Sequence, residues 1–193
     1  MNRILGDFKD ELPVSQEGLT IVFSPTSLPL QQRWRNNGLS ADFMADYFAT
    51  FFPGCENDSP ETGSQAELKS AVSFIANELL ENAMKFNDEA SPHPISIRLQ
   101  MDRHVLVFVA TNSVNLQASE KFQTFIKKLL NSDPSELYIH HLEKDGQENS
   151  NSVSGLGLLT MVNDYCAKLG WKFETLPESP DVITVTTMVQ LTL

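Results

Sequence analysis

The spacing of apolar residues in the first part of the chain predicts one strand and two helices. Residues 19–23 (LTIVF) form a β-branched run that ends at Ser-Pro, which is typical of a strand. Apolar residues then recur at helical spacing over residues 41–52, with Ser40 as the expected N-cap and Pro-Gly as the stop. After a polar loop at residues 53–64, the longest helical pattern covers residues 65–86.

Strand and helix patterns continue through the remainder of the chain. Two alternating runs at residues 95–99 and 104–109 predict a β-hairpin, and residues 112–115 are turn-like. Further segments are expected at residues 118–131 (helix), 132–154 (mobile loop), 155–169 (helix, with Gly170 as its C-cap), 171–175 (strand) and 182–193 (strand). The order favours an α+β fold, a two-layer α/β sandwich with a mixed, mostly antiparallel sheet.

Composition and charge narrow the classes of function. The chain has 193 residues, of which 41% are hydrophobic and 20% charged, so one globular domain, alone or with an extension, is expected. Its formal net charge of −11 disfavours nucleic acid and anionic membranes as partners, because both carry negative charge. A nucleotide remains compatible, since Mg²⁺ and a few local donors can hold a triphosphate in an acidic protein.

The cysteines and the N-terminal residues predict a cytoplasmic protein. Cys55 and Cys166 are far apart and lack metal-ligand spacing, which fits a reducing compartment. The first ten residues contain no apolar core of a signal peptide, and no run approaches the length of a membrane span. We also expect Cys166 to be a core residue and residues 7–12 to belong to a solvated acidic tail.

Three polar side chains on the long predicted helix form a candidate site. At about 100° per residue, Glu78, Asn82 and Lys85 lie on one flank of the apolar stripe that includes Leu79. An Asn oxygen can bind Mg²⁺, a Glu can accept a proton, and a Lys can contact a phosphate. The alternative is an ordinary solvated helix face with no chemical role.

A glycine-rich segment forms a second candidate site. The sequence from Ser154 to Val162 reads SGLGLLTMV, with Gly155, Leu156 and Gly157 just before a predicted helix. Glycines allow close approach of the backbone to a phosphate, and the following helix presents free N–H groups to the anion. The alternative is a loop-to-helix turn in which the glycines serve only close packing.

Together these two segments resemble the nucleotide-binding boxes of the GHKL (Bergerat-fold, histidine-kinase-like) ATPase superfamily. ELLENAMKF is similar to the N-box and GLGL to the second glycine box, so the resemblance covers roughly residues 65–193. It implies an ATP-binding core there, with helices on one face of the sheet, and an N-terminal extension at residues 1–64. It further implies ATP and Mg²⁺ as cofactors, with Asn82 on the metal, Lys85 at a phosphate, and Gly155, Leu156 and Gly157 around the phosphates.

The first glycine box of that superfamily, Asp-x-Gly-x-Gly, has no counterpart here. The corresponding residues 110–115 read ATNSVN, and the stretch from Pro94 to Ser154 contains a single glycine, Gly146. Asn112 is the expected substitute for the Asp, because its carboxamide oxygen can also accept from the adenine amino group. The departure leaves two hypotheses open, a modified ATP site or a fold that has lost nucleotide binding.

In plan, the chain resembles the stand-alone anti-sigma-factor serine kinases and the SiaB-like bacterial regulatory kinases. The resemblance implies that Glu78 is the base for a Ser or Thr hydroxyl on a small partner protein, and it leaves a homodimer open. The alternative is a non-catalytic module that binds a signalling partner. A metal site at His140-His141 is disfavoured because adjacent side chains rarely point the same way, and Lys127 and Lys128 are expected on a solvated face.

Overall fold

The computed structural model describes residues 2–12, 17–24, 30–51, 65–102, 104–145, 155–176 and 179–193. The predicted loop at residues 53–64 lies outside these ranges, as does Ser154 of the second motif, whereas the first helix ends at Ala49, three residues before its predicted end at Phe52. The elements are β1 (Asn2–Gly6), β2 (Gly18–Phe23), α1 (Leu30–Ala49), α2 (Gln65–Lys85), β3 (Ile95–Asp102), β4 (Val105–Asn115), α3 (Leu116–Asn131), α4 (Pro134–Asp145), α5 (Leu156–Asn163), β5 (Lys168–Leu176) and β6 (Ser179–Thr192).

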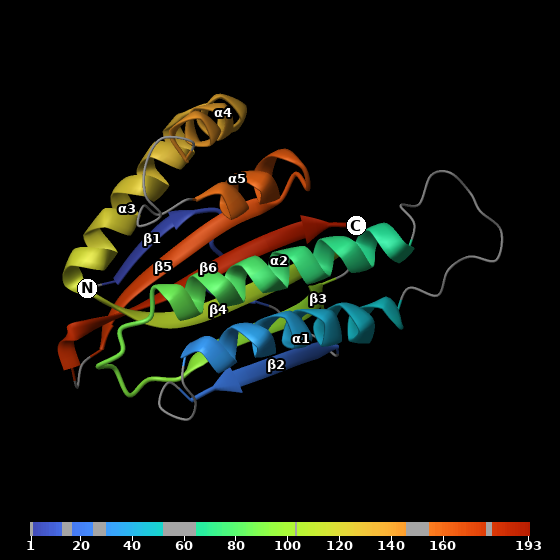
Figure 1. The fold of residues 1–193 in the computed structure, drawn as a ribbon, viewed down its shortest axis with the longest axis horizontal. Helices are drawn as coiled ribbons and strands as arrows, with labels where there is room; N and C mark the ends of the chain where they lie inside the picture. Colours follow the sequence, from blue (N-terminus) through green and yellow to red (C-terminus); the bar gives the residue numbers. More distant parts are fainter. Residues whose placement is uncertain are drawn as a thin grey trace.

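One six-stranded sheet organises the chain. Its strand order is β1-β5-β6-β4-β3-β2, and every pairing is antiparallel. The two strands that come first in the sequence therefore form the two opposite edges of the sheet (Figure 1). The N-terminal segment is thus built into the same sheet as the remainder of the chain.

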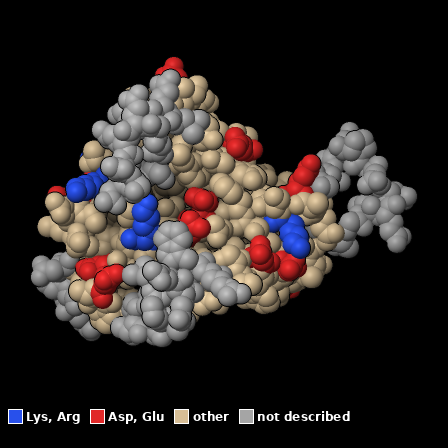
Figure 2. All heavy atoms as spheres, viewed as in Figure 1, with Lys and Arg blue, Asp and Glu red and all other residues tan. Residues whose placement is uncertain are grey.

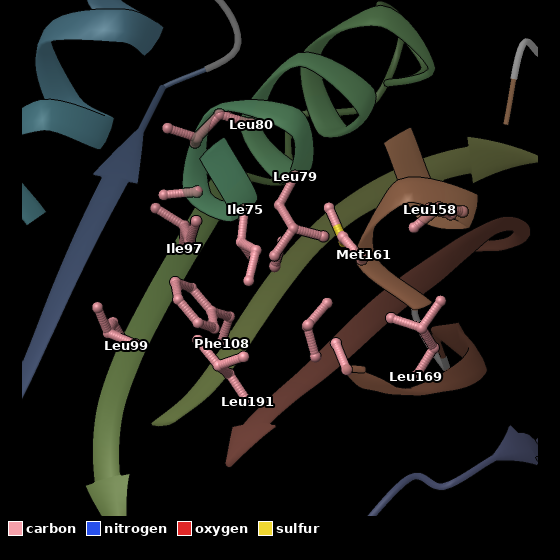
Figure 3. Packing of buried hydrophobic residues seen from close by; sticks show 14 of the residues in the cluster. Ile75, Leu79, Leu80, Ile97, Leu99, Phe108, Leu158, Met161, Leu169 and Leu191 are labelled. Atoms are coloured by element: carbon pink, nitrogen blue, oxygen red, sulfur yellow. The ribbon is translucent and has the colours of Figure 1, made fainter. Parts of the chain in front are cut away.

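The helices cover one face of this sheet, which confirms the predicted two-layer sandwich (Figure 1). The apolar stripe of α2 packs on inward-facing residues of the central strands, as the predicted periodicity requires. Figure 3 shows Leu79 of α2 directed toward Met161 of α5, above the strands that carry Phe108 and Leu191. Burying each such side chain contributes about 1.5–3 kcal/mol, so this interface fixes the position of α2.

Strand β4 extends further than the sequence predicts. Its pairing with β6 continues without a break from Val105↔Thr192 to Asn115↔Val182, so residues 112–115 are strand and the predicted turn is wrong. Polar residues at these positions predicted a turn on the surface, whereas Asn112 and Ser113 are both buried in the sheet. The chain turns only where Asn115 caps α3, its side-chain oxygen accepting from the backbone N–H of Ala118 at 2.9 Å.

Other predicted boundaries are also corrected. Helix α1 begins at Leu30, ten residues before the predicted cap Ser40, which therefore lies inside the helix. The predicted mobile loop at residues 132–154 contains helix α4, whose first turn is capped by the Asp133 carboxylate. Both errors arose because apolar positions are sparse on these helices, so periodicity alone did not reveal them.

The last predicted helix is shorter than expected. Helix α5 ends at Asn163, and Gly170 lies within β5 rather than capping a helix. Between these elements the chain turns at Cys166, which is exposed and has a φ of 51°, so its prediction as a core residue is wrong. A turn that requires a left-handed residue, followed at once by sheet pairing, overrides the helical pattern.

Part of the far face of the sheet is covered by the residues that follow β1, which are therefore no free tail. The backbone carbonyl of Asp7 accepts a 2.6 Å hydrogen bond from Gln190 Nε2, and the Asp10 carboxylate lies 2.8 Å from Lys172 Nζ. Gly170 allows this close approach, because a Cβ there would lie 2.7 Å from the carbonyl carbon of Asp7. The N-terminal residues thus bury polar groups of the sheet that would otherwise face solvent.

We predict that Gly170→Ala lowers the free energy of unfolding by about 1–3 kcal/mol, since the added methyl group overlaps backbone atoms that cannot move independently. Gly38→Ala is the matched control. Gly38 lies in α1, where a Cβ meets nothing within 4 Å, so alanine there should stabilise by roughly 0.5–1 kcal/mol. Urea unfolding of both variants measures the two effects, and equal stabilities would contradict the proposed contact.

None of the helices in the described part of the chain has the length and apolar character that a bilayer crossing needs.

Candidate functional site

A cavity of about 280 Å³ lies above the sheet, between α2, α3 and the start of α5. It combines an apolar interior with a small set of polar groups, which is the usual character of a small-molecule site. Its lining residues are Leu79, Asn82, Ala83, Phe86, Ala110, Asn112, Val114, Asn115, Gln117, Ala118, Lys121, Phe122, Gly155, Leu158, Val185 and Thr187. Three of the residues predicted from the sequence, Asn82, Asn112 and Gly155, therefore meet in one cavity.

The floor of the cavity is formed by β4 and β6. Ala110, Asn112 and Val114 alternate along β4, so their side chains share the face of the sheet that α2 covers. Thr187 and Val185 of β6 lie opposite Ala110 and Asn112 in the register. Asn112 is 8% exposed, and its Nδ2 lies 3.4 Å from the carbonyl oxygen of Ser113. A single buried carboxamide thus stands in the middle of a largely apolar floor.

Asn82 projects from the α2 wall of the cavity. The buried stripe of α2 fixes the rotation of the helix, and this rotation turns the half-buried Asn82 toward the cavity. Its carboxamide makes no side-chain hydrogen bond within the described part of the chain, so the Asn82 oxygen remains available to a ligand. An amide oxygen of this kind suits Mg²⁺, which would take its other ligands from phosphates and water.

Glu78 lies one turn before Asn82 and contacts the second glycine motif. A Cβ added to Gly157 would overlap the Glu78 carboxylate and lie 2.7 Å from its Cδ, so the carboxylate occupies space that only glycine leaves free. Burial raises the pKa of Glu78, and the negative charge of Glu81 raises it further. A half-buried carboxylate with a raised pKa has the properties of a proton acceptor.

Gly155 joins the cavity to the N-terminus of α5. Its φ of 54° is left-handed, and a Cβ there would lie 2.6 Å from Cε2 of the Phe125 ring on α3, so glycine is required on two grounds. Within the described part of the chain, no side-chain hydrogen bond caps α5 at Gly155. The backbone N–H groups at the start of a helix have no partner inside it, so those of Leu156 and Gly157 can bind an anion.

Lys85 and Leu156 do not line the cavity. Lys85 is exposed, and its Nζ lies 5.3 Å from the centroid of the Phe86 ring. Phe86 does line the cavity, so the Lys85 ammonium group is at the outer side of that wall. Leu156 contributes the first residue of α5 and is half-buried.

Helix α3 contributes cavity residues that were not predicted from the sequence. Ala118, Lys121 and Phe122 line the cavity at helical spacing, whereas Lys127 and Lys128 do not. The i, i+3, i+4 spacing was a usable signal, because it places these three residues on one face of the helix, where Lys121 lines the cavity although its side chain is exposed. Lys121 is the one cationic side chain among the cavity residues.

The surface around the helices carries mixed charge. On the face shown in Figure 2, the coloured acidic and basic side chains are interspersed, with no large basic patch among the described residues. His140 is exposed, and the described residues contain no group of three or more His, Cys, Asp or Glu side chains placed to hold a metal.

Comparisons with known proteins identify a relative by fold. No protein-family model matches the chain, and no curated protein matches it by sequence. Among solved structures, the chain is similar to a chain in the crystal structure of the SiaB–SiaC complex from Pseudomonas aeruginosa. The TM-score is 0.59 at 14% sequence identity, and the match covers 90% of this chain and 89% of that chain. This likeness shows a shared fold over nearly the whole length of both chains.

Proposed function

We propose that this protein is a regulator in bacterial signalling that binds ATP with Mg²⁺ and phosphorylates a Ser or Thr of a small partner protein. The observation that carries the proposal is the meeting of the two sequence motifs: Asn82 and Gly155 line one cavity, and Glu78 contacts Gly157 beside it. The structural neighbour was solved as a complex of two proteins, which supports a protein partner.

Under this proposal, each residue of the site has a separate role. Asn112 on the floor would meet the base, and the free N–H groups of α5 together with Lys121 or Lys85 would contact the phosphates. Asn82 would hold Mg²⁺, which supplies neutralisation of the phosphate charge. The Glu78 carboxylate would take the proton of the attacking hydroxyl as its oxygen bonds to the γ-phosphorus and the bond to ADP breaks. Positioning and charge neutralisation would provide most of the rate.

A second candidate function is a binding module that uses no ATP. Two observations favour it: β4 continues as paired strand where a glycine-rich loop is expected, and the cavity of about 280 Å³ is at the lower end of ligand pockets. In this case the partner would dock without regard to nucleotide, and Glu78 and Asn82 would be ordinary helix residues.

Isothermal titration of the full chain with ATP, in the presence of Mg²⁺ or of EDTA, decides between the two functions. The proposal predicts saturable binding that requires Mg²⁺. Absence of both binding heat and a thermal shift at millimolar ATP would overturn it and leave the binding module. Where ATP binds, mass spectrometry of a co-purified partner tests for a phosphorylated Ser or Thr.

We predict that Lys121→Ala weakens ATP binding about tenfold or more, because the variant removes the one cationic side chain among the described residues that line the cavity. Lys127→Ala is the matched control, since Lys127 is also an exposed lysine of the same helix but does not line the cavity. The same titration measures both dissociation constants. Equal affinities in the two variants would remove Lys121 from the site and leave Lys85 as the phosphate contact.

A further inference from the structure

The polar groups that line the cavity share one chemical property. Apart from Lys121, they are carboxamides and one hydroxyl: Asn82, Asn112, Asn115, Gln117 and Thr187. Each of these groups can both donate and accept a hydrogen bond. No carboxylate is found among the described residues that line the cavity. A ligand at the floor of the cavity can therefore present either a hydrogen-bond donor or an acceptor and still find a partner.

The orientation of the Asn112 carboxamide is only weakly held. Its contact from Nδ2 to the Ser113 carbonyl oxygen is 3.4 Å, beyond the usual range for N–H···O bonds. Its Oδ1 accepts no hydrogen bond within the described part of the chain, and the neighbouring floor side chains Ala110, Val114 and Val185 are apolar. Rotation of the terminal amide by 180° therefore loses one long contact and exchanges the donor and acceptor at the floor.

The two orientations of the Asn112 carboxamide match the hydrogen-bonding edges of two kinds of purine. A 6-aminopurine presents an N–H donor at position six beside a ring-nitrogen acceptor, and a carboxamide pairs with it through Oδ1 and Nδ2. A 6-oxopurine presents the reverse, a carbonyl acceptor beside a ring N–H donor, and the rotated carboxamide pairs with it equally well. An ionised carboxylate only accepts, so on either purine it pairs with the single N–H group and repels the neighbouring acceptor.

We propose that the base end of this cavity does not select for adenine, and that the site takes 6-oxopurine nucleotides as well as ATP, with Asn112 as the residue that sets this tolerance. The inference rests on the proposed nucleotide-binding function and specifies its ligand class. Thr187 supports it, because its hydroxyl lies at the same floor and can likewise reverse its hydrogen bond.

The test compares ATP with inosine triphosphate, which carries a carbonyl and a ring N–H where ATP carries an amino group and a bare ring nitrogen. Both are titrated with Mg²⁺ into the wild-type protein, Asn112→Asp and Asn115→Asp. Asn115 is the matched control: it lines the same cavity and caps α3, where Asp is an equally good cap, so this variant adds the same charge away from the floor.

We expect the two nucleotides to bind the wild-type protein within about threefold of each other, because each finds both of its hydrogen bonds. Asn112→Asp should weaken both nucleotides by about tenfold or more, because one acceptor of either purine then faces an ionised carboxylate, and Asn115→Asp should have a smaller effect on both. Asn112→Ser, which keeps a donor and an acceptor on a shorter side chain, should weaken both nucleotides to the same extent, and it replaces the Asp variant if that variant fails to fold.

The failure of this inference is distinct from the failure of the proposed function. Binding of ATP with inosine triphosphate more than about thirtyfold weaker in the wild-type protein would overturn the tolerance and leave ATP binding intact. Affinities for both nucleotides that are insensitive to Asn112→Asp would remove Asn112 from the base site. Binding of neither nucleotide would overturn the proposed function itself, and the inference with it.

Discussion

Asn82→Ala is expected to weaken Mg²⁺-dependent ATP binding by about a hundredfold, which corresponds to about 2.7 kcal/mol. Asn82 lines the cavity, is half-buried and makes no side-chain hydrogen bond among the described residues, so its replacement removes the proposed metal ligand and no structural contact. Alanine is also the better helix former, so the free energy of unfolding should stay equal or rise by a few tenths of a kcal/mol.

Asn77→Ala is the matched control for this experiment. Asn77 is an asparagine on the same helix, but it faces the groove between α1 and α2 and donates a hydrogen bond to Glu81 at 3.0 Å. Titration with ATP, with and without Mg²⁺, should show wild-type affinity in Asn77→Ala and loss of the Mg²⁺ effect in Asn82→Ala. Equal affinities in both variants, with both folded by circular dichroism, would rule out Asn82 as the metal ligand.

Glu78→Gln is expected to lower the rate of ADP formation by about 10²–10⁴-fold while ATP binding stays within a few-fold of wild type. Gln keeps the shape of the side chain in the space beside Gly157, but it cannot accept the proton. A quenched-flow or coupled assay of ADP release, together with the titration, separates the two effects. Loss of binding and rate together would assign Glu78 to positioning of the nucleotide rather than to proton transfer.

The raised pKa of Glu78 also predicts the pH dependence. Because Glu78 must be ionised to act as a base, the rate should fall with decreasing pH, with a midpoint above the ordinary value of 4.5. Glu81→Gln removes a negative neighbour, lowers the pKa of Glu78 and should move this acidic limb to lower pH. A pH–rate profile that is unchanged in Glu81→Gln would contradict the coupling between the two carboxylates.

The same pKa shift makes a prediction about stability. A carboxyl group whose pKa is raised by folding binds its proton more tightly in the folded state, so its ionised form destabilises the fold at neutral pH. Glu78→Gln should therefore raise the melting temperature at pH 7, and the gain should vanish as the pH falls below 4.5. A constant difference across this range would mean that the ionisation of Glu78 does not change on folding.

Much of the fold could be read from periodicity. The apolar stripe of α2, the hairpin of β3 and β4, and the strand β6 each bury one face, so their patterns of period 3.6 or 2 were complete in the sequence. Elements without such a pattern were missed. Strand β1 is short and half exposed, and α4 has few apolar residues, so only contacts with distant segments reveal them.

The site divides in the same way. Helical spacing placed Glu78 and Asn82 on one flank of the predicted helix, and the glycines before α5 marked a second segment, but the resemblance to the GHKL boxes singled out both. Only the packing of helices across the sheet brings the two motifs to one cavity. The same packing places Gly157 in close contact with Glu78 and adds Lys121 of α3 to the cavity lining.

The sequence by itself thus determined the class of fold and the places of the two motifs, on α2 and before α5, since each depends on residues within a few turns of one another. Only the tertiary structure decided that β4 runs straight through Asn112 to Asn115, because a strand is stabilised by its neighbour and β6 lies some seventy residues away. This pairing sets Asn112 in the floor of the cavity with a loosely held carboxamide. Under the proposed function, it is this buried amide, rather than a glycine-rich loop, that faces the base.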